Sequence, residues 1–243
     1  IFGLTNQELS NLNLPEKEMV LIKPYYTTEQ VKRYYTATRA NTQWLIYTDS
    51  TYKKESSMDG FPILKAHLDQ FRLIFTSDNK PYGLHRARDS RFFSGSKIIC
   101  QRKCAELPVF SYSDGECYLT QTFNIIKTNR VNIMYLTGLL NSKLIAFWLR
   151  NRGKMQGLNY QLDKEPLQQI PIAVPNVEVQ IRIGRIVEEI IRLKSANENA
   201  SIKDLENQID NIVYHLYDLT HDEVLIVDPQ TPISSEEYKS LNL

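Results

Sequence analysis

The segment from residue 153 to residue 180, GKMQGLNYQLDKEPLQQIPIAVPNVEVQ, divides the chain into two parts that differ in charge and hydrophobic pattern. Residues 1–175 contain 23 Lys and Arg against 15 Asp and Glu, and residues 176–243 contain 6 against 13. Net charges of +8 and −7 are therefore hidden in a formal total of +1. Such asymmetry indicates an anionic partner. We predict a basic domain over residues 1–175 and a helical scaffold or docking segment over residues 176–243.

The acidic part has the apolar periodicity of two amphipathic helices. Apolar residues recur at spacings of three and four in two stretches separated by the polar sequence SANENAS, first at Val179, Ile183, Ile186, Val187, Ile190 and Ile191, then at Ile202, Leu205, Ile209, Ile212, Val213 and Leu216. This pattern predicts an antiparallel helical hairpin. Thr220 and Glu223 have the spacing of a capping box for one more short helix.

The basic part has a mixed pattern without a βαβ rhythm. Thr27 or Thr28 is placed to cap a short helix through residues 31–35, and Asn129 or Asn132 to open a helix ending near residues 151–153. Strands are expected at residues 44–49, 71–76, 97–101, 108–113 and 117–127, and the last two are joined by a hairpin turn at Asp114, Gly115 and Glu116. The fold class predicted is α+β: a twisted, mainly antiparallel, β-rich domain with flanking helices, followed by the helical hairpin.

No catalytic motif stands out, so we expect no enzyme activity of this segment itself. The GxGxxG, GxxxxGK[ST], HExxH and GxSxG patterns are missing, as are the Asn-Pro-Pro-aromatic motif and a nuclease core. Cys100, Cys104 and Cys117 form a poor zinc pattern, so we expect no metal and a reducing, cytoplasmic setting. No apolar run suits a membrane or a leader. A first residue of Ile1 suggests an excised fragment.

Residues 80–154 contain 13 Lys and Arg against 4 Asp and Glu, a surface suited to the closely spaced phosphates of duplex DNA. Arg and Gln side chains also have the geometry to read guanine and adenine edges. The DNA-binding residues predicted in this region and beside it are Lys32, Arg33, Arg86, Arg88, Arg91, Lys97, Gln101, Arg102, Lys103, Lys127, Arg130, Lys154, Gln156, Asn159 and Tyr160.

Explanations other than DNA binding also fit these residues. The basic residues can form a solvated face on a protein-interaction scaffold that docks through its acidic helices. Arg33 can equally be a surface salt-bridge residue. Gln156, Asn159 and Tyr160 can brace a structural turn that locks the basic domain to the helices. A binder of RNA or single strands is a third class, which would require exposed aromatic residues on adjacent strands.

Several segments, in order, resemble restriction-modification proteins. The stretch LTGLLNSKLIAFWLRNRGKMQGLNYQLDKEPLQQIPIAVPNVEVQ is similar to the end of the TaqI-like C-terminal specificity domain of adenine methyltransferases, and to the related type I specificity subunits. The segments IKPYYTTEQVKRYY, HRARDSRFFSGSKIICQ and IDNIVYHLYDLTHDEV resemble other blocks of that domain. The matching positions at the junction are Gly153, Gln156, Leu167, Ile170, Pro171, Ile172, Pro175 and Gln180.

The resemblance implies a prokaryotic DNA target-recognition domain that binds double-stranded DNA sequence-specifically. Methyl transfer, with S-adenosylmethionine as cofactor, is then expected of a separate adenine methyltransferase domain in the parent enzyme. No cofactor is expected in this segment. Fused type II enzymes carry a nuclease domain as well, and the resemblance leaves open whether the parent of this chain does. Because recognition residues lie on variable loops in such domains, the DNA-binding residues above rest on charge and chemistry alone.

Overall fold

The computed structural model describes residues 1–37, 43–75 and 78–241. The chain forms two compact units, of which the first comprises Ile1–Gln30, Thr38–Gly95 and Gly115–Thr120. The second comprises Val31–Ala37, Ser96–Asp114 and Gln121–Leu243. The helices after residue 175 thus belong to the same compact unit as several strands of the basic part. A functional division at residue 175 stays a prediction.

The first unit is built on a four-stranded sheet in the order β1 (Gly3–Thr5), β4 (Gln43–Ile46), β2 (Ile22–Tyr26) and β8 (Tyr118–Leu119). Strands β1, β4 and β2 are antiparallel neighbours, and β8 runs parallel to β2. The helices are α1 (Asn6–Leu12), α2 (Glu16–Met19) and α3 (Pro62–Asp69), with 3-10 turns at Ser50–Lys53, Glu55–Met58, Arg72–Ile74 and Ser90–Phe92. Its core contains Leu4, Ile22, Ile46, Met58, Leu64, Leu68 and Tyr82.

The second unit contains two sheets. One has the order β3 (Tyr34–Tyr35), β7 (Phe110–Ser113), β5 (Lys97–Gln101) and β9 (Phe123–Ile126). In it β7 and β9 flank β5 as antiparallel neighbours, and β3 runs parallel to β7. The other has the order β10 (Lys154–Gln156), β11 (Asn159–Gln161) and β6 (Lys103–Cys104), all antiparallel. The second sheet carries much of the candidate site.

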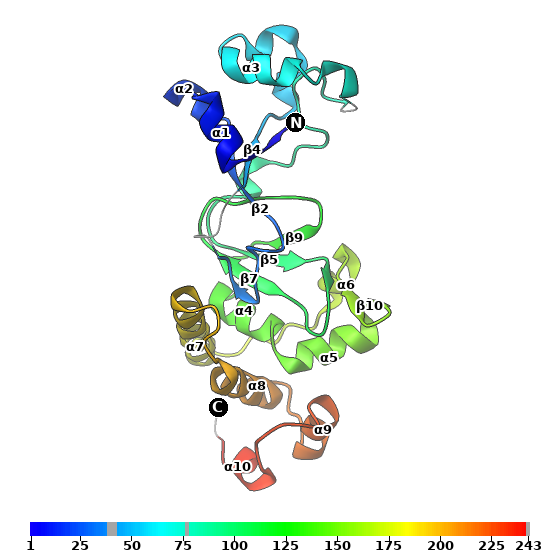
Figure 1. The fold of residues 1–243 in the computed structure, drawn as a ribbon. Coiled ribbons are helices and arrows are strands. Elements are labelled where there is room, and N and C mark those ends of the chain that lie inside the picture. Colours follow the sequence, from blue (N-terminus) through cyan, green and yellow to red (C-terminus); the bar gives the residue numbers. More distant parts are fainter. Residues whose placement is uncertain (38–42, 76–77, 242–243) are drawn as a thin grey trace. The chain divides into compact units, whose positions relative to one another are not determined.

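Helices supply most of the core of the second unit. They are α4 (Ile133–Leu140), α5 (Lys143–Arg152), α6 (Lys164–Gln169), α7 (Val177–Ala196), α8 (Lys203–Leu216), α9 (His221–Val227) and α10 (Ser235–Ser240). Helix α4 packs against α7 and against β5 and β7 (Figure 1). A Cβ at Gly138 would lie 2.6 Å from Ile183 Cγ2, so the absence of a side chain there lets α4 and α7 approach closely.

The predicted fold class is confirmed, since antiparallel pairings predominate and helices flank the sheets and close the chain. Several local predictions are also confirmed. Strand β4 overlaps the strand expected at residues 44–49, Asn132 caps α4, and α7 and α8 follow the two apolar stripes. Thr220 and Glu223 form the capping box of α9. No helix in the described part of the chain is long and apolar enough to cross a membrane.

The helix expected over residues 31–35 is wrong. The Thr27 side chain donates to Gln30 Oε1 at 2.8 Å, which closes a turn instead of capping a helix. Tyr34 then has a positive φ of 73°, and Tyr34 and Tyr35 form β3 beside β7. Aromatic residues suit a sheet that buries them, and burial prevails over the weak helical pattern.

Three further local predictions are corrected. Residues 72–74 form a 3-10 turn instead of part of a strand. The Asp114-Gly115 hairpin does not form, because β7 pairs with β5 and β3 whereas β8 pairs with β2. The strands of residues 44–127 are accordingly spread over different sheets. The expected single helix from Asn132 is interrupted at Asn141, and Ser142 caps a new helix, α5.

Candidate nucleic-acid interface

The sheet β10–β11–β6 has one polar face and one buried face. Lys154, Gln161 and Lys103 are cross-strand neighbours in one row, and Met155, Tyr160 and Cys104 in the next. Because side chains on adjacent residues of a strand point to opposite faces, the two rows face opposite ways. Tyr160 and Cys104 lie in the core, whereas Lys103 and Lys154 are exposed. The fold thus gathers predicted site residues from two distant segments onto one surface.

Strands β10 and β11 form a hairpin with Gln156 opposite Asn159, so the connecting turn has two residues. Gly157, the first of them, has a φ of 62°, a conformation that glycine adopts at no steric cost. Leu158 follows at the tip with 83% of its surface exposed. The side chains of Gln156 and Asn159 are exposed as well. The hairpin therefore presents two amides and one apolar side chain to solvent.

Tyr160 anchors this hairpin to α5. Its residue is only 1% exposed, and its hydroxyl accepts hydrogen bonds from Arg150 Nε and a terminal guanidinium nitrogen, both at 3.2 Å. The Arg150 guanidinium also stacks over the ring, 5.5 Å from its centroid. Tyr160 thus braces the turn, the alternative left open on the sequence, and its position offers no contact surface for DNA.

Arg102 and Gln101 are engaged within the second unit. The Arg102 guanidinium forms an ion pair with Asp163, and its Nη1 donates to the carbonyl of Gln121 at 3.1 Å. The Arg102 hydrogen bond, and secondarily one from Gln161, lowers the pKa of Asp163, which keeps this carboxylate charged. Gln101 Nε2 donates to the carbonyl of Val31 at 2.7 Å. Neither side chain is free to read a base without breaking these contacts.

Other predicted cations of the second unit have structural roles or are hidden. Arg33 forms an ion pair with Glu206 of α8, donates to the carbonyl of Asn141 and stacks over the ring of Tyr34. Lys32 lies 3.6 Å from Glu198. Lys97, at the start of β5, is 0% exposed and therefore does not reach solvent. Arg130 and Lys127, beside the N-terminal end of α4, are exposed.

The predicted arginines of the first unit lie in the loop before Phe93. Arg86 is exposed and has a φ of 53°. Asp89 accepts three hydrogen bonds from the Arg91 guanidinium, and these bonds lower the pKa of Asp89 to about 2. The Arg88 carbonyl accepts from Tyr47, whose ring meets the Tyr118 ring at 4.6 Å. The aromatics near this loop thus form a packed cluster that supports it.

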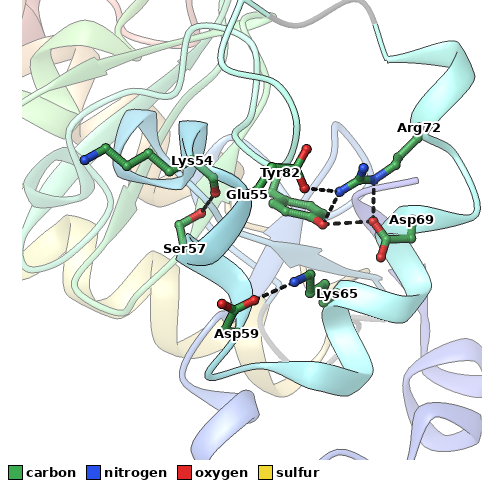
Figure 2. Close-up of polar contacts among 8 residues, drawn as sticks. All are labelled: Lys54, Glu55, Ser57, Asp59, Lys65, Asp69, Arg72 and Tyr82. Atoms are coloured by element: carbon green, nitrogen blue, oxygen red, sulfur yellow. Dashed lines mark hydrogen bonds and ion pairs between the residues drawn. The ribbon is translucent and has the colours of Figure 1, made fainter.

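Arg72, in the first unit, adds to the positive charge counted from the sequence, but in the structure acidic side chains neutralise it. Figure 2 shows its guanidinium between Asp69, at 2.6 Å, and the hydroxyl of Tyr82, at 2.5 Å. Glu55 forms a further ion pair with it. The same view shows Lys65 bonded to Asp59 at 2.5 Å. These contacts tie α3 to the turns around it and leave no excess positive charge.

The cations Arg86, Lys103, Arg130 and Lys154 are exposed and, within the described ranges of the chain, form no side-chain hydrogen bond or ion pair, although the charge of Lys154 acts on Asp163. Sequence reasoning missed Gln161 and Leu158, which share the hairpin surface, and it gave no role to Asp163, the ion-pair partner of Arg102. The sequence signal that could have found Gln161 and Leu158 is the glycine at Gly157, which favours a two-residue hairpin turn. Once a hairpin is assumed, alternation places Gln161 on the face of Lys154.

The structure shows no sign of thiol or metal chemistry in the part that it describes. The three cysteines are buried and form no disulfide. Burial raises the pKa of Cys100 well above its usual value and that of Cys104 to about 11, so both are protonated thiols at neutral pH. Among the described residues, no group of three or more His, Cys, Asp or Glu side chains could hold a metal ion.

Comparisons with known structures show the fold. The type IIL restriction-modification enzyme MmeI, solved in complex with DNA, has a TM-score of 0.70 over 99% of this chain at 15% identity. The type IIG restriction endonuclease BpuSI covers 86% of this chain with a TM-score of 0.48 and 13% identity. This chain spans 34% and 28% of the lengths of those two chains. A comparison with curated proteins gives no match.

A comparison with protein families is more specific. The family described as the TaqI-like C-terminal specificity domain matches residues 23–172. That range covers more than half of the 243 residues and includes both the arginine loop and the β10–β11 hairpin. The chain therefore belongs to the family of TaqI-like C-terminal specificity domains.

Proposed function

We propose that this chain is the sequence-specific double-stranded DNA recognition module of a restriction-modification enzyme. The observation that carries the proposal is its membership of a specificity-domain family over residues 23–172. The physical support is the position of the exposed cations. Lys103 and Lys154 share one face of a sheet in the second unit, and Arg86 lies on an exposed loop of the first.

In this proposal the cations divide into two groups. Lys103, Lys154 and Arg130 bind phosphates, because a lysine or arginine on an exposed surface neutralises the backbone charge without reading sequence. Arg86 and Arg88, in the loop before Phe93, read guanine edges in the major groove, a contact for which arginine has the geometry. Arg33, Lys97 and Tyr160 are withdrawn from the contact set, because their contacts or burial engage them inside the second unit.

The proposal extends to the parent enzyme. The MmeI chain is about three times as long as the part of it that this chain covers, and its structure was solved with DNA. We propose that this chain likewise works beside a separate adenine methyltransferase domain, which supplies S-adenosylmethionine chemistry. The specificity module would place that domain on the target and contribute no reacting group itself. The proposal does not depend on whether the parent enzyme also has a nuclease domain.

Salt-dependent binding to duplex DNA tests the proposal. The full-length protein carrying this chain is titrated with a fluorescent random duplex between 50 and 200 mM salt. Arg86→Ala, Lys103→Ala and Lys154→Ala are each expected to weaken binding to all sequences or to relax one base position by ~1–3 kcal/mol, and a lysine that grips a phosphate reduces the salt slope by ~1.

Arg185→Ala and Lys203→Ala are the matched controls, because both side chains are exposed on the acidic helices α7 and α8. They are expected to leave affinity and slope unchanged. Duplex binding without salt dependence, or no binding at all, would contradict the proposal and favour a protein-interaction scaffold. Equal losses in the control variants would show that the contact surface lies elsewhere.

A further inference from the structure

Two amides at the tip of the hairpin β10–β11 are unused in the described part of the chain, whereas three other strand amides of the second unit are bonded, Gln161 of the same hairpin among them. Gln101 donates to Val31, Asn124 Nδ2 donates to Leu162 at 2.7 Å, and Gln161 Nε2 donates to Asp163 at 2.9 Å. Gln156 and Asn159, at the tip, have no side-chain partner within the described part of the chain. Their donors and acceptors are therefore available to a ligand.

The two amides also lie next to each other. Gln156 and Asn159 are direct cross-strand partners, and such partners have Cβ atoms about 4.5–5.5 Å apart on the same face of a hairpin. Leu158 stands beside them with 83% of its surface exposed, so its apolar side chain is open to contact with a ligand. The tip of the hairpin therefore combines two hydrogen-bonding amides with one apolar side chain on a small surface.

The tip is held in place from behind. Tyr160 alternates with Asn159 and is buried against α5, where Arg150 hydrogen bonds to its hydroxyl. Leu162 N donates to the carbonyl of Arg102 at 2.8 Å, which extends the pairing of β11 with β6. A fixed hairpin loses little conformational entropy when its tip binds. Lys154 and Lys103 stand on the same face, farther from the tip.

We propose that the β10–β11 tip enters the major groove and reads an A·T base pair. This rests on the proposed DNA-recognition function. The major groove admits a two-stranded ribbon, and Gln or Asn binds adenine bidentately at N6 and N7. The thymine of the same pair carries a C5-methyl group, which suits contact with an apolar side chain. Gln156 and Asn159 thus read the adenine edge, Leu158 packs on the thymine methyl, and Lys154 and Lys103 hold phosphates.

The test starts from a library of randomised duplexes bound by the full-length protein and sequenced. Wild type is expected to enrich a motif containing at least one A·T pair that depends on the tip. Gln156→Ala and Asn159→Ala, singly and together, should lower the preference for that pair by roughly 5- to 150-fold, the size of one bidentate base contact. Affinity for random duplex should fall far less than this preference, because neither substitution removes a charge. Gln168→Ala, an exposed amide on α6, is the matched control.

Two base analogues tie the loss to particular atoms. Replacing the adenine by 7-deazaadenine removes the N7 acceptor, and replacing the thymine by deoxyuridine removes the methyl group. Wild type should lose affinity for both duplexes. The Gln156→Ala/Asn159→Ala variant should be insensitive to the first analogue, and Leu158→Ala to the second.

The outcomes separate this inference from the function on which it rests. If wild type binds no duplex, the proposed function fails and the inference with it. If wild type enriches a motif that all tip variants share unchanged, only the inference is overturned. A uniform loss of affinity without a change of motif would also overturn it, because it would make the tip a contact to the DNA backbone.

Discussion

Asp210 lies buried on α8 and accepts a hydrogen bond from the backbone N–H of Lys143 at 2.8 Å. The Lys143 ammonium is 4.0 Å from its other oxygen but only 2.6 Å from Asp228. Burial raises the pKa of Asp210 from 3.8 to about 6, against the opposing effects of Lys143 and Arg33. The folded state therefore holds this proton more tightly than the unfolded state does.

The size of the effect follows from that difference in pKa. Below about pH 4 both states are protonated, and between pH 4 and pH 6 only the folded state keeps the proton. The stability that Asp210 contributes is thus fully present below pH 4 and is lost as the pH rises through about 6. At ~1.4 kcal/mol per unit of pKa, the loss is about 3 kcal/mol.

Asp210→Asn tests this directly. The asparagine oxygen can still accept from the Lys143 N–H, but the group no longer titrates. Relative to wild type, the variant should gain about 3 kcal/mol of unfolding free energy between pH 4 and pH 7. Lowered pKa values at Asp89 and Asp163 push the profile of both proteins the opposite way, so the difference between the two proteins is the informative quantity.

Urea unfolding at a series of pH values, followed by Trp148 fluorescence, measures the difference. Trp148 lies on α5 in the second unit, and a Trp44→Phe background removes the only other tryptophan, which lies in the first unit. A difference that stays flat with pH would refute the reasoning. A difference that moves in favour of aspartate as the pH rises would show that Lys143 outweighs burial.

Two further predictions concern packing and charge. Gly138→Val should lower the unfolding free energy by about 2–3 kcal/mol in the same assay, because a Cβ there would lie 2.6 Å from Ile183 Cγ2 and 3.0 Å from Val187 Cγ2; an unchanged urea midpoint would contradict it. Asp163→Asn should strengthen binding to random duplex and steepen the salt dependence by ~1, because it releases the Arg102 guanidinium from its carboxylate. Weaker binding would show that the ion pair positions the surface for DNA.

Local signals predicted the helices well. Asn132 and Thr220 cap the helices that their side chains indicate, and the apolar stripes of α7 and α8 face the core. A cap or a stripe needs only residues within about four positions of each other, all visible in the sequence. The break between α4 and α5 was missed, because Asn141 is held there by Phe110, whose carbonyl accepts from its Nδ2 at 2.7 Å.

Strand pairing was harder to predict because its partners are distant. Asp114-Gly115 has the sequence of a hairpin turn, yet β7 and β8 pair with β5 and β2. The spacing of apolar residues around Tyr34 and Tyr35 suggests a helix. These two residues form a strand because they pair with β7. Sheet register depends on which apolar faces are buried together, a property of the whole unit.

The sequence by itself determined the charge asymmetry, the helical end of the chain and the family, because composition, periodicity and motif order are properties of the chain alone. Tertiary structure decided which cations stay available to a partner. Arg102 is matched by Asp163, 61 residues away, Arg33 by Glu206, and Lys97 is buried. The residue type gives the charge of a side chain, but its exposure and its counter-ion depend on residues that folding brings near. The same applies to residues 153–180, where folding buries Tyr160 and leaves Gln156 and Asn159 exposed.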